Sequence, residues 1–162
     1  MPPASIQDVL SEIAQAFQGV VRPAVMLHPE SHDDSEIVVF YRYKRWQDIE
    51  NKDIEHKNAA LCFVGAEGFQ FLIPAYMRFA LTHLESGCFS VDATIYALHP
   101  HGELESFQRS KFVALTTVQR RAIRRFLECM VENSQSVDAD AALAGLEHYW
   151  KDADRIGPTK CE

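Results

Sequence analysis

The sequence predicts an all-α protein, a single-domain compact helical bundle of about six to seven helices around one central helix. Two observations favour this class. First, residues 66–84 are apolar around most of a helical circumference at about 100° per residue, as expected for a helix buried among others. Second, amphipathic stretches preceded by capping residues flank this segment, starting near residues 5 and 116. We expect one helical domain over residues 1–157 and a disordered C-terminal tail over 158–162.

The central helix, Ala66–Leu84, is predicted to be kinked at Pro74. A proline inside a helix removes the hydrogen bond that its N–H would donate to the carbonyl of Gln70, and it bends the axis. Apolar side chains leave a narrow polar strip along this helix, formed by Glu67, Gln70, Arg78, Thr82 and Glu85. Pro74 falls within the strip, and long helices curve with their convex side towards water. We therefore expect Pro74 to face solvent while Tyr76 and Met77 are enclosed.

The first helix is predicted to start at Ser5. Its hydroxyl can accept from the backbone N–H of Asp8, whose carboxylate can accept in return, and this arrangement is a capping box. An apolar stripe at helical spacing follows as far as Phe17, and Gly19 is a natural end. A loop is expected over residues 20–34.

Residues 36–46 (EIVVFYRYKRW) leave two interpretations open. Their β-branched and aromatic content favours a strand, whereas Asp33 followed three residues later by Glu36 is a helix-start pattern. Propensity alone leans to the strand. Asp48 or Asn51 is then expected to cap the helix that precedes the central one. The predicted inward face of that helix is Ile54, Leu61 and Cys62.

A short helix and a loop are expected after the central helix. Ser90 is predicted to cap a two-turn helix that runs through Leu98 and stops before Pro100, because a residue that precedes proline disfavours the helical conformation. A loop over residues 99–106 (HPHGELES) and a short irregular helix over 107–115 follow.

Two helices with recognisable start residues complete the expected fold. Thr116 and Gln119 form a capping box that opens a helix to about Asn133, and Asp138 caps the last helix. The predicted inward residues of the first are Val118, Ala122, Phe126, Leu127 and Met130. Those of the second are Leu143, Leu146, Trp150 and Ala153.

The composition narrows the function classes. The 162 residues carry a net charge of −7, which disfavours a general nucleic-acid or anionic-membrane surface and fits a basic protein partner. The four cysteines lack zinc-site spacing. Cys62 and Cys129 are predicted to be reduced core residues, and Cys88 the most exposed thiol. The N-terminus lacks the regions of a signal peptide, and no apolar run approaches ~18 residues, so a soluble cytoplasmic protein is expected.

Three stretches carry a resemblance to a known family. They are residues 43–49 (YKRWQDI), 65–77 (GAEGFQFLIPAYM) and 110–126 (SKFVALTTVQRRAIRRF). Together they are similar to the DUF6714 family, a bacterial domain of unknown function. The matching positions are Trp46, Asp48, Ile49, Glu67, Phe69, Pro74, Ala75, Tyr76, Met77, Phe112, Leu115, Thr116, Gln119, Ala122, Ile123, Phe126 and Leu127. Gly65 departs from the family's capping Thr. The resemblance implies an all-helical domain and favours a helix over residues 36–45, but it implies no catalytic residues.

Two pairs of histidines are candidate metal ligands, His28 with His32 and His99 with His101. Imidazole and carboxylate groups suit zinc or manganese. The acidic residues near the two pairs are Asp33, Asp34, Glu36, Glu103 and Glu105. However, Pro29 interrupts the first pair, whose spacing works only on a helix, and the known closed-site spacings are absent. A polar loop and a solvated turn explain both pairs, so no metal or cofactor is assigned.

Two groups of residues are candidates for binding a partner. The first can line a groove and consists of Trp46, Asp48, Tyr76 and Arg109. In the competing interpretation, Trp46 anchors its loop on the core and Asp48 caps the next helix. The second group is an arginine row at residues 120, 121, 124 and 125, in which Arg121 and Arg125 are the candidate phosphate-binding residues. The negative net charge favours a salt-bridged face there, for example with Glu128.

These observations favour a non-enzymatic binding or interaction protein, in its most specific form an inhibitor or immunity-type protein that covers a basic surface of its partner. The sequence contains neither a nucleophile-elbow motif nor a phosphate-binding loop motif. A metal-dependent enzyme built on the loop histidines and carboxylates is the first alternative. Nucleic-acid binding through the Arg120–Arg125 face is the second.

Overall fold

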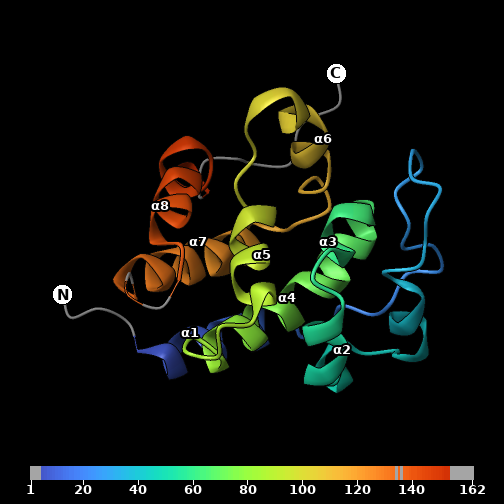
Figure 1. Ribbon diagram of the computed structural model, residues 1–162, viewed down its shortest axis with the longest axis horizontal. Helices are drawn as coiled ribbons and strands as arrows, with labels where there is room; N and C mark the ends of the chain where they lie inside the picture. The colour runs from blue at the N-terminus through green and yellow to red at the C-terminus, as the bar shows by residue number, and fades with distance from the viewer. Residues whose placement is uncertain (1–4, 134, 136, 154–162) are drawn as a thin grey trace.

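The computed structural model describes residues 5–133, 135 and 137–153, which form an all-α domain (Figure 1). Its α-helices are α1 (Ile6–Ala16), α2 (Asn51–His56), α3 (Ala60–Phe63), α4 (Ala66–Thr82), α5 (Phe89–Ala97), α6 (Glu105–Ser110), α7 (Thr117–Glu132) and α8 (Ala139–His148). The 3₁₀ helices of the same residues are η1 (Val38–Arg42), η2 (Trp46–Asp48), η3 (Gly102–Leu104) and η4 (Trp150–Asp152). This described part contains no β-strand, so the predicted all-α class is confirmed.

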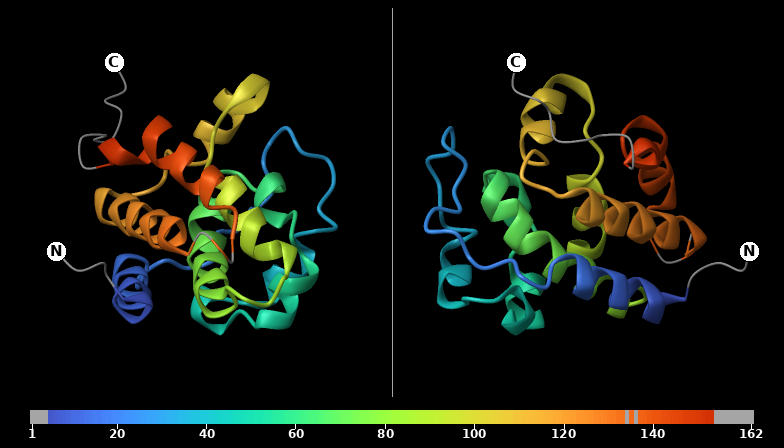
Figure 2. Two further views of the ribbon diagram at one scale, coloured as in Figure 1. Left: turned by 60° about the vertical axis from the view of Figure 1, so that its left-hand side comes forward. Right: turned by 180° about the vertical axis from the view of Figure 1, so that it is seen from behind.

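Helix α4 runs through the middle of the molecule, as the views of Figure 1 and Figure 2 show together. Helix α1 packs against α4 and α7, and α8 packs against α7 and α5. Helices α2 and α3 contact α4 and α5 on the opposite side, while η3 and α6 extend beyond the end of α5. The molecule therefore has a side built from α1, α4 and α7 and a side built from α3, α5 and α6.

The central helix is enclosed as predicted. Phe69, Tyr76 and Met77 have no exposed surface. Near the start of α4, a Cβ atom added at Gly68 would lie 2.5 Å from the carbonyl oxygen of Met26. Only glycine lets another segment of backbone pass so close to a helix. The chain around residue 26 is thereby packed directly against the first turn of α4.

The prediction that Pro74 faces water is wrong, because Pro74 is buried. Neighbouring segments cover the middle of the polar strip, on both sides of Pro74, and bond its side chains there, while Glu67, Thr82 and Glu85 at the ends of the strip are exposed. Gln70 donates to the carbonyl of Ala114 at 3.0 Å, and Arg78 donates to the carbonyls of Gln47 and Ile49 at 3.0 and 2.9 Å. Acceptors from distant segments therefore bond the side chains on both sides of the proline.

Both predicted capping boxes are present. The hydroxyl of Ser5 accepts from the N–H of Asp8 at 3.1 Å, and that of Thr116 accepts from the N–H of Gln119 at 3.2 Å. The side chains of Asp8 and Gln119 accept in return from the cap backbone. Asp138 caps α8 as expected. Local sequence patterns thus set the starts of α1, α7 and α8.

Two predicted inward residues on these helices are wrong. Val118 is 55% exposed and Leu143 is 43% exposed. Val118 lies in the first turn of α7, where the neighbouring Arg120 is buried instead, and α8 buries its small residues Ala142 and Gly145. The other residues predicted to face inwards are buried or half-buried, although Trp150 and Ala153 lie beyond the end of α8, in and just after η4. Hydrophobicity therefore locates the packed face of each helix but misassigns one residue at its edge.

Residues 36–46 do not form the strand that propensity favours; the helix that the resemblance favours is present over part of the segment, as the short 3₁₀ helix η1. Side chains hold this segment to the chain before it. The guanidinium of Arg22 donates to the carbonyl of Tyr43 at 3.1 Å, and the hydroxyl of Tyr41 accepts from the backbone N–H of residue 26 at 3.0 Å. Strand propensity reflects only the local sequence and does not include bonds between distant residues. It therefore predicts a strand where the structure has none.

The predicted caps Asp48, Asn51 and Ser90 are wrong. Helix α2 begins after Glu50 and α5 begins after Cys88, and neither residue makes a side-chain cap bond. Ser90 lies inside α5, where its hydroxyl donates to a carbonyl of α2 at 2.7 Å. Helix α6 also begins earlier than expected, within the segment predicted as loop. The shorter helices on this side thus start without the side-chain caps that α1, α7 and α8 have.

The segment before α4 forms two short helices, α2 and α3, instead of one. The carbonyl of Lys57, between them, accepts a hydrogen bond from the buried hydroxyl of Tyr76. Ile54 and Leu61 are buried as predicted, but Cys62 is exposed and its predicted core position is wrong. Cys129 on α7 is buried, as expected.

Within the described ranges, we find no helix that is both long and apolar enough to cross a membrane. The expected end of the ordered chain at residue 157 and the expected tail over 158–162 lie outside the described residues. The boundary between domain and tail therefore stays a prediction.

Candidate functional site

The histidines predicted as metal ligands lie outside the α-helices. Nδ1 of His28 accepts from the backbone N–H of residue 30 at 3.1 Å, and its ring lies 4.5 Å from that of Phe107. His32 is exposed, and His99 and His101 stack on each other with ring centroids 4.3 Å apart. Across the part of the chain that the structure describes, no group of three or more His, Cys, Asp or Glu side chains is arranged to hold a metal ion.

A further histidine joins the second pair. His148, at the end of α8, donates through Nε2 to Glu105 of α6, and this hydrogen bond lowers the pKa of Glu105. Burial lowers the pKa of His99, and the positive charges of His101 and His148 lower it further. These side chains surround a depression of about 510 Å³. Sequence reasoning missed His148 because it lies on a different helix, far along the chain.

The four predicted groove residues do not share one surface. Trp46 is only 2% exposed, and its indole N–H donates to a backbone carbonyl of the α1 C-terminus at 2.9 Å. Tyr76 is fully buried. Asp48 is exposed in η2, while Arg109 lies on α6, where it contacts Glu105 at 3.2 Å. The burial of Trp46 matches the alternative interpretation, in which it anchors its loop on the core.

Arg120 is separated from the rest of the arginine row by burial. It is 7% exposed, and its guanidinium donates three hydrogen bonds. The acceptors are the carbonyls of Phe112 and Leu115, at 2.7 and 3.3 Å, and the hydroxyl of Tyr149, at 3.0 Å. Arg120 therefore joins the start of α7 to the turn before it and to the end of α8.

The other arginines of the row lie closer to the surface and have acidic neighbours. Arg125 contacts Glu12 of α1 at 3.3 Å, and Arg124 lies 3.7 Å from Glu128. Arg121 is exposed. This part of the row is thus partly salt-bridged, so its positive charge is already balanced in part by carboxylates of the same chain.

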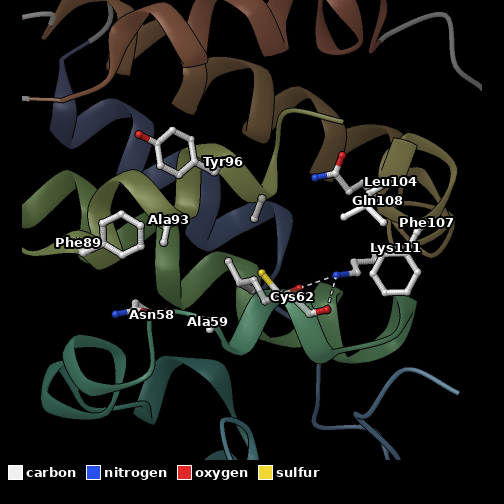
Figure 3. A pocket seen from close by; sticks show the side chains of 12 residues that line it. Asn58, Ala59, Cys62, Phe89, Ala93, Tyr96, Leu104, Phe107, Gln108 and Lys111 are labelled. Atoms are coloured by element: carbon white, nitrogen blue, oxygen red, sulfur yellow. Dashed lines mark hydrogen bonds between the residues drawn. The ribbon is translucent and has the colours of Figure 1, made fainter. Parts of the chain in front are cut away.

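The site that combines a cavity with unusual side chains is a pocket between α3, α5 and α6 (Figure 3). Its volume is about 270 Å³, close to the lower end of the roughly 300–1,000 Å³ of small-ligand sites. Most of its wall is apolar, from Leu61, Phe89, Ala93, Ala97, Leu104 and Phe107. No local pattern in the sequence marks this site, because the three helices that form it are short and come from separate parts of the chain.

Two polar residues at the pocket wall bond to other parts of the protein. The hydroxyl of Tyr96 donates to Oδ2 of Asp138 at 2.8 Å, and this bond raises the pKa of Tyr96 to about 12. The side-chain oxygen of Gln108 accepts from the backbone N–H of His101 at 2.9 Å. Both groups therefore stabilise the wall of the pocket.

Lys111 is the buried cation of this pocket. It is 5% exposed, and its ammonium donates to the carbonyls of Leu61 and Cys62, each at 2.9 Å (Figure 3). The ring of Phe107 lies 4.6 Å from Nζ. Burial lowers the pKa of Lys111 to about 8. The sequence gives no indication of this, because Lys111 follows a polar helix and precedes an apolar run, as many exposed lysines do.

Exposed apolar side chains mark the rim of the pocket. Phe89 is 57% exposed, Leu104 is 64% exposed and Tyr96 is 39% exposed. Cys62 lines the same pocket, and its thiol is free. Burying a large apolar side chain is worth about 1.5–3 kcal/mol, so leaving several exposed at one place indicates a surface that a ligand can cover.

Fold and pocket together define the class: a small all-helical protein with an apolar pocket at one side of its central helix. The chain belongs to the family of unknown function DUF6714, whose family model matches residues 5–154, so the resemblance in the three sequence stretches is confirmed. Comparison with curated proteins finds no match, and neither does comparison with solved structures. Any inference about the ligand has to come from the chemistry of the site itself.

Proposed function

We propose that the protein is a non-catalytic binding protein, and that the pocket between α3, α5 and α6 is its binding site for a small molecule with an apolar body. The observation that carries this proposal is the combination of an apolar cavity of about 270 Å³ with the exposed rim residues Phe89, Leu104 and Tyr96. An apolar ligand would remove both the cavity wall and the rim from water, which is the main source of free energy for such binding.

The polar contacts of the pocket support binding over catalysis. A general acid or base needs a reactive group within hydrogen-bond reach of the substrate. Here the hydroxyl of Tyr96 is engaged by Asp138, and the side-chain oxygen of Gln108 is engaged by a backbone N–H. The pocket therefore offers mainly apolar contact, with Lys111 as its charged group.

Titration with the neutral dye N-phenylnaphthylamine, whose fluorescence rises in apolar surroundings, tests the proposal. We expect saturable binding of one dye per chain. The variant Ala93→Trp fills the pocket from α5 and is expected to abolish the signal, because the indole occupies the cavity. Ala14→Trp places the same side chain on an exposed position of α1 and is the matched control. A dye signal that is absent in the wild type, or equal in the two variants, contradicts the proposal.

A basic protein partner is a second candidate, in the form of an inhibitor or immunity-type interaction. The net charge of −7 and an exposed acidic loop with Glu30, Asp33 and Asp34 favour it. Pull-downs from the native host can compare the wild type with a variant in which these three residues are lysine. Recovery of the same basic protein by the wild type alone, with release at high salt, supports this interaction. Recovery by neither contradicts it.

A further inference from the structure

Lys111 carries a charge that its surroundings do not balance. An ammonium group has three N–H donors, and two of those of Lys111 go to the carbonyls of Leu61 and Cys62. Beyond these two carbonyls, Nζ contacts the face of the Phe107 ring at 4.6 Å, and no carboxylate of the described residues lies within salt-bridge distance to supply a counter-charge. Buried charges in proteins are normally paired. An unmatched cation at the wall of a cavity therefore favours an anion inside that cavity.

The rest of the pocket limits what kind of anion fits. Its wall is apolar opposite and beside Lys111, from Phe89, Ala93 and Leu104. A small hydrated ion such as phosphate would have to give up its water to these side chains without compensation. A molecule with one charged end and an apolar remainder places each part against matching surroundings.

We propose that the natural ligand is a small carboxylic acid with an apolar tail, whose carboxylate binds the ammonium of Lys111 while the tail fills the cavity towards Phe89 and Leu104. This inference rests on the proposed function and specifies the ligand class of the same site. A volume of about 270 Å³ corresponds to about nine groups of roughly 30 Å³, the size of one water molecule. A medium-chain fatty acid or an aromatic acid has this size.

Binding of a carboxylate should change the protonation of Lys111, whereas binding of an uncharged apolar molecule should not. Burial holds the pKa of Lys111 at about 8, and a nearby negative charge favours the charged form of lysine. At about pH 8 roughly half of the molecules carry a neutral Lys111. Binding of an acid should therefore draw a proton from the buffer into the complex, whereas binding of an uncharged molecule should not.

The test compares octanoate with octanol on the wild-type protein by isothermal titration calorimetry at about pH 8. We expect octanoate to bind at least about tenfold more tightly, because a charge-assisted hydrogen bond in a buried site adds to the apolar contact. Repeating the titration in buffers of different ionisation enthalpy should show uptake of about half a proton per octanoate. Octanol should show none.

Two variants assign the effect to Lys111. Lys111→Met keeps the length and apolar stem of the side chain, and we expect the ratio of octanoate to octanol affinity to fall to about one. Lys44→Met removes an exposed lysine that does not line the pocket, so the ratio should stay at the wild-type value. If Lys111→Met does not fold, the proton uptake of the wild type decides the question, because no variant is needed for it.

The outcomes separate this inference from the proposed function. Equal affinities for octanoate and octanol, or a preference for octanoate without proton uptake, overturn the carboxylic acid but leave the apolar pocket in place. Absence of binding by both octanol and the neutral dye overturns the pocket as a ligand site, and the inference falls with it.

Discussion

Arg120 and Lys111 are both buried basic residues, but they lie on different sides of the molecule and have different surroundings. Arg120, on the side of α1, α4 and α7, donates three hydrogen bonds that join α7 to the turn before it and to Tyr149. Lys111, on the side of α3, α5 and α6, donates two hydrogen bonds and borders a cavity. The first cation connects structural elements away from the pocket, whereas the second lies at the wall of a cavity that a ligand can enter.

The same difference appears in the helices around the two residues. Helices α1 and α7 begin with complete capping boxes, while α3, α5 and α6 have no side-chain cap bond. The second side also exposes Phe89 and Leu104. Binding sites are commonly built where packing and local stability are incomplete, because a ligand supplies the missing contacts. The proposed binding site thus lies on the side whose short helices begin without side-chain caps.

The largest expected effect is a difference in the free energy of unfolding between two variants, each of which replaces one of the buried cations by methionine. Arg120→Met leaves two buried carbonyls and a hydroxyl without their partner, and each such group costs about 1–3 kcal/mol. We expect the free energy of unfolding to fall by about 4 kcal/mol. Lys111→Met at neutral pH should change it by less than about 1 kcal/mol, since the two lost bonds are offset by removal of a charge whose burial is unfavourable enough to lower the pKa of Lys111 to about 8. Urea unfolding followed by circular dichroism measures both.

Equal losses in Arg120→Met and Lys111→Met would show that the two cations have the same structural role. Lys111 would then be a positioning residue for α3, bonded through the carbonyls of Leu61 and Cys62, rather than a residue kept for a ligand. The comparison between the two sides of the molecule would lose its main support.

The pH dependence of stability gives the next largest effect. Burial lowers the pKa of Lys111 in the folded protein to about 8, from an ordinary value of 10.5. Between these two pH values the unfolded chain binds more protons than the folded protein, so the free energy of unfolding rises with pH. The cost of burying the charged lysine is present in full below about pH 8. It is relieved as the pH rises to about 10.5. The difference in unfolding free energy, wild type minus Lys111→Met, should therefore increase by about 3 kcal/mol over this range.

Urea unfolding of both proteins at several pH values measures this difference, and subtraction removes the contribution of other titrating groups. Saturation with octanoate should reduce the increase, because a bound carboxylate raises the pKa of Lys111 towards its unfolded value. A flat difference across this pH range would mean that Lys111 is not held in a desolvated position.

The sequence predicts the side built from α1, α4 and α7 well, because the features that define it are local. The starts of α1 and α7 depend on residues three positions apart, such as Thr116 and Gln119, and the burial of α4 depends on its own apolar periodicity. Both are local properties of the chain. Pro74 shows the limit, because its burial depends on carbonyls of distant segments that bond Gln70 and Arg78.

The candidate site depends almost entirely on contacts between distant segments, and none of it was predicted. Lys111 is buried because α3 offers it carbonyls from far earlier in the chain, and Cys62 borders the pocket because the expected long helix is broken at Lys57. The sequence predicts a loop at Leu104, and single exposed apolar residues are common in loops. An apolar residue in such a loop, next to a helix without a cap, is the pattern that points to this pocket.

The smallest expected effect on the free energy of unfolding comes from changing one helix cap on each side of the molecule. Thr116→Ala removes the capping box of α7 and should lower the free energy of unfolding by about 1 kcal/mol, while Thr116→Ser keeps the cap and is the control. Cys88 stands at the cap position of α5 with extended backbone angles but makes no cap bond. Cys88→Ser should therefore raise the free energy of unfolding by about 0.5 kcal/mol. A loss at Thr116 without a gain at Cys88 would show that missing side-chain caps do not limit the stability of the helices around the pocket.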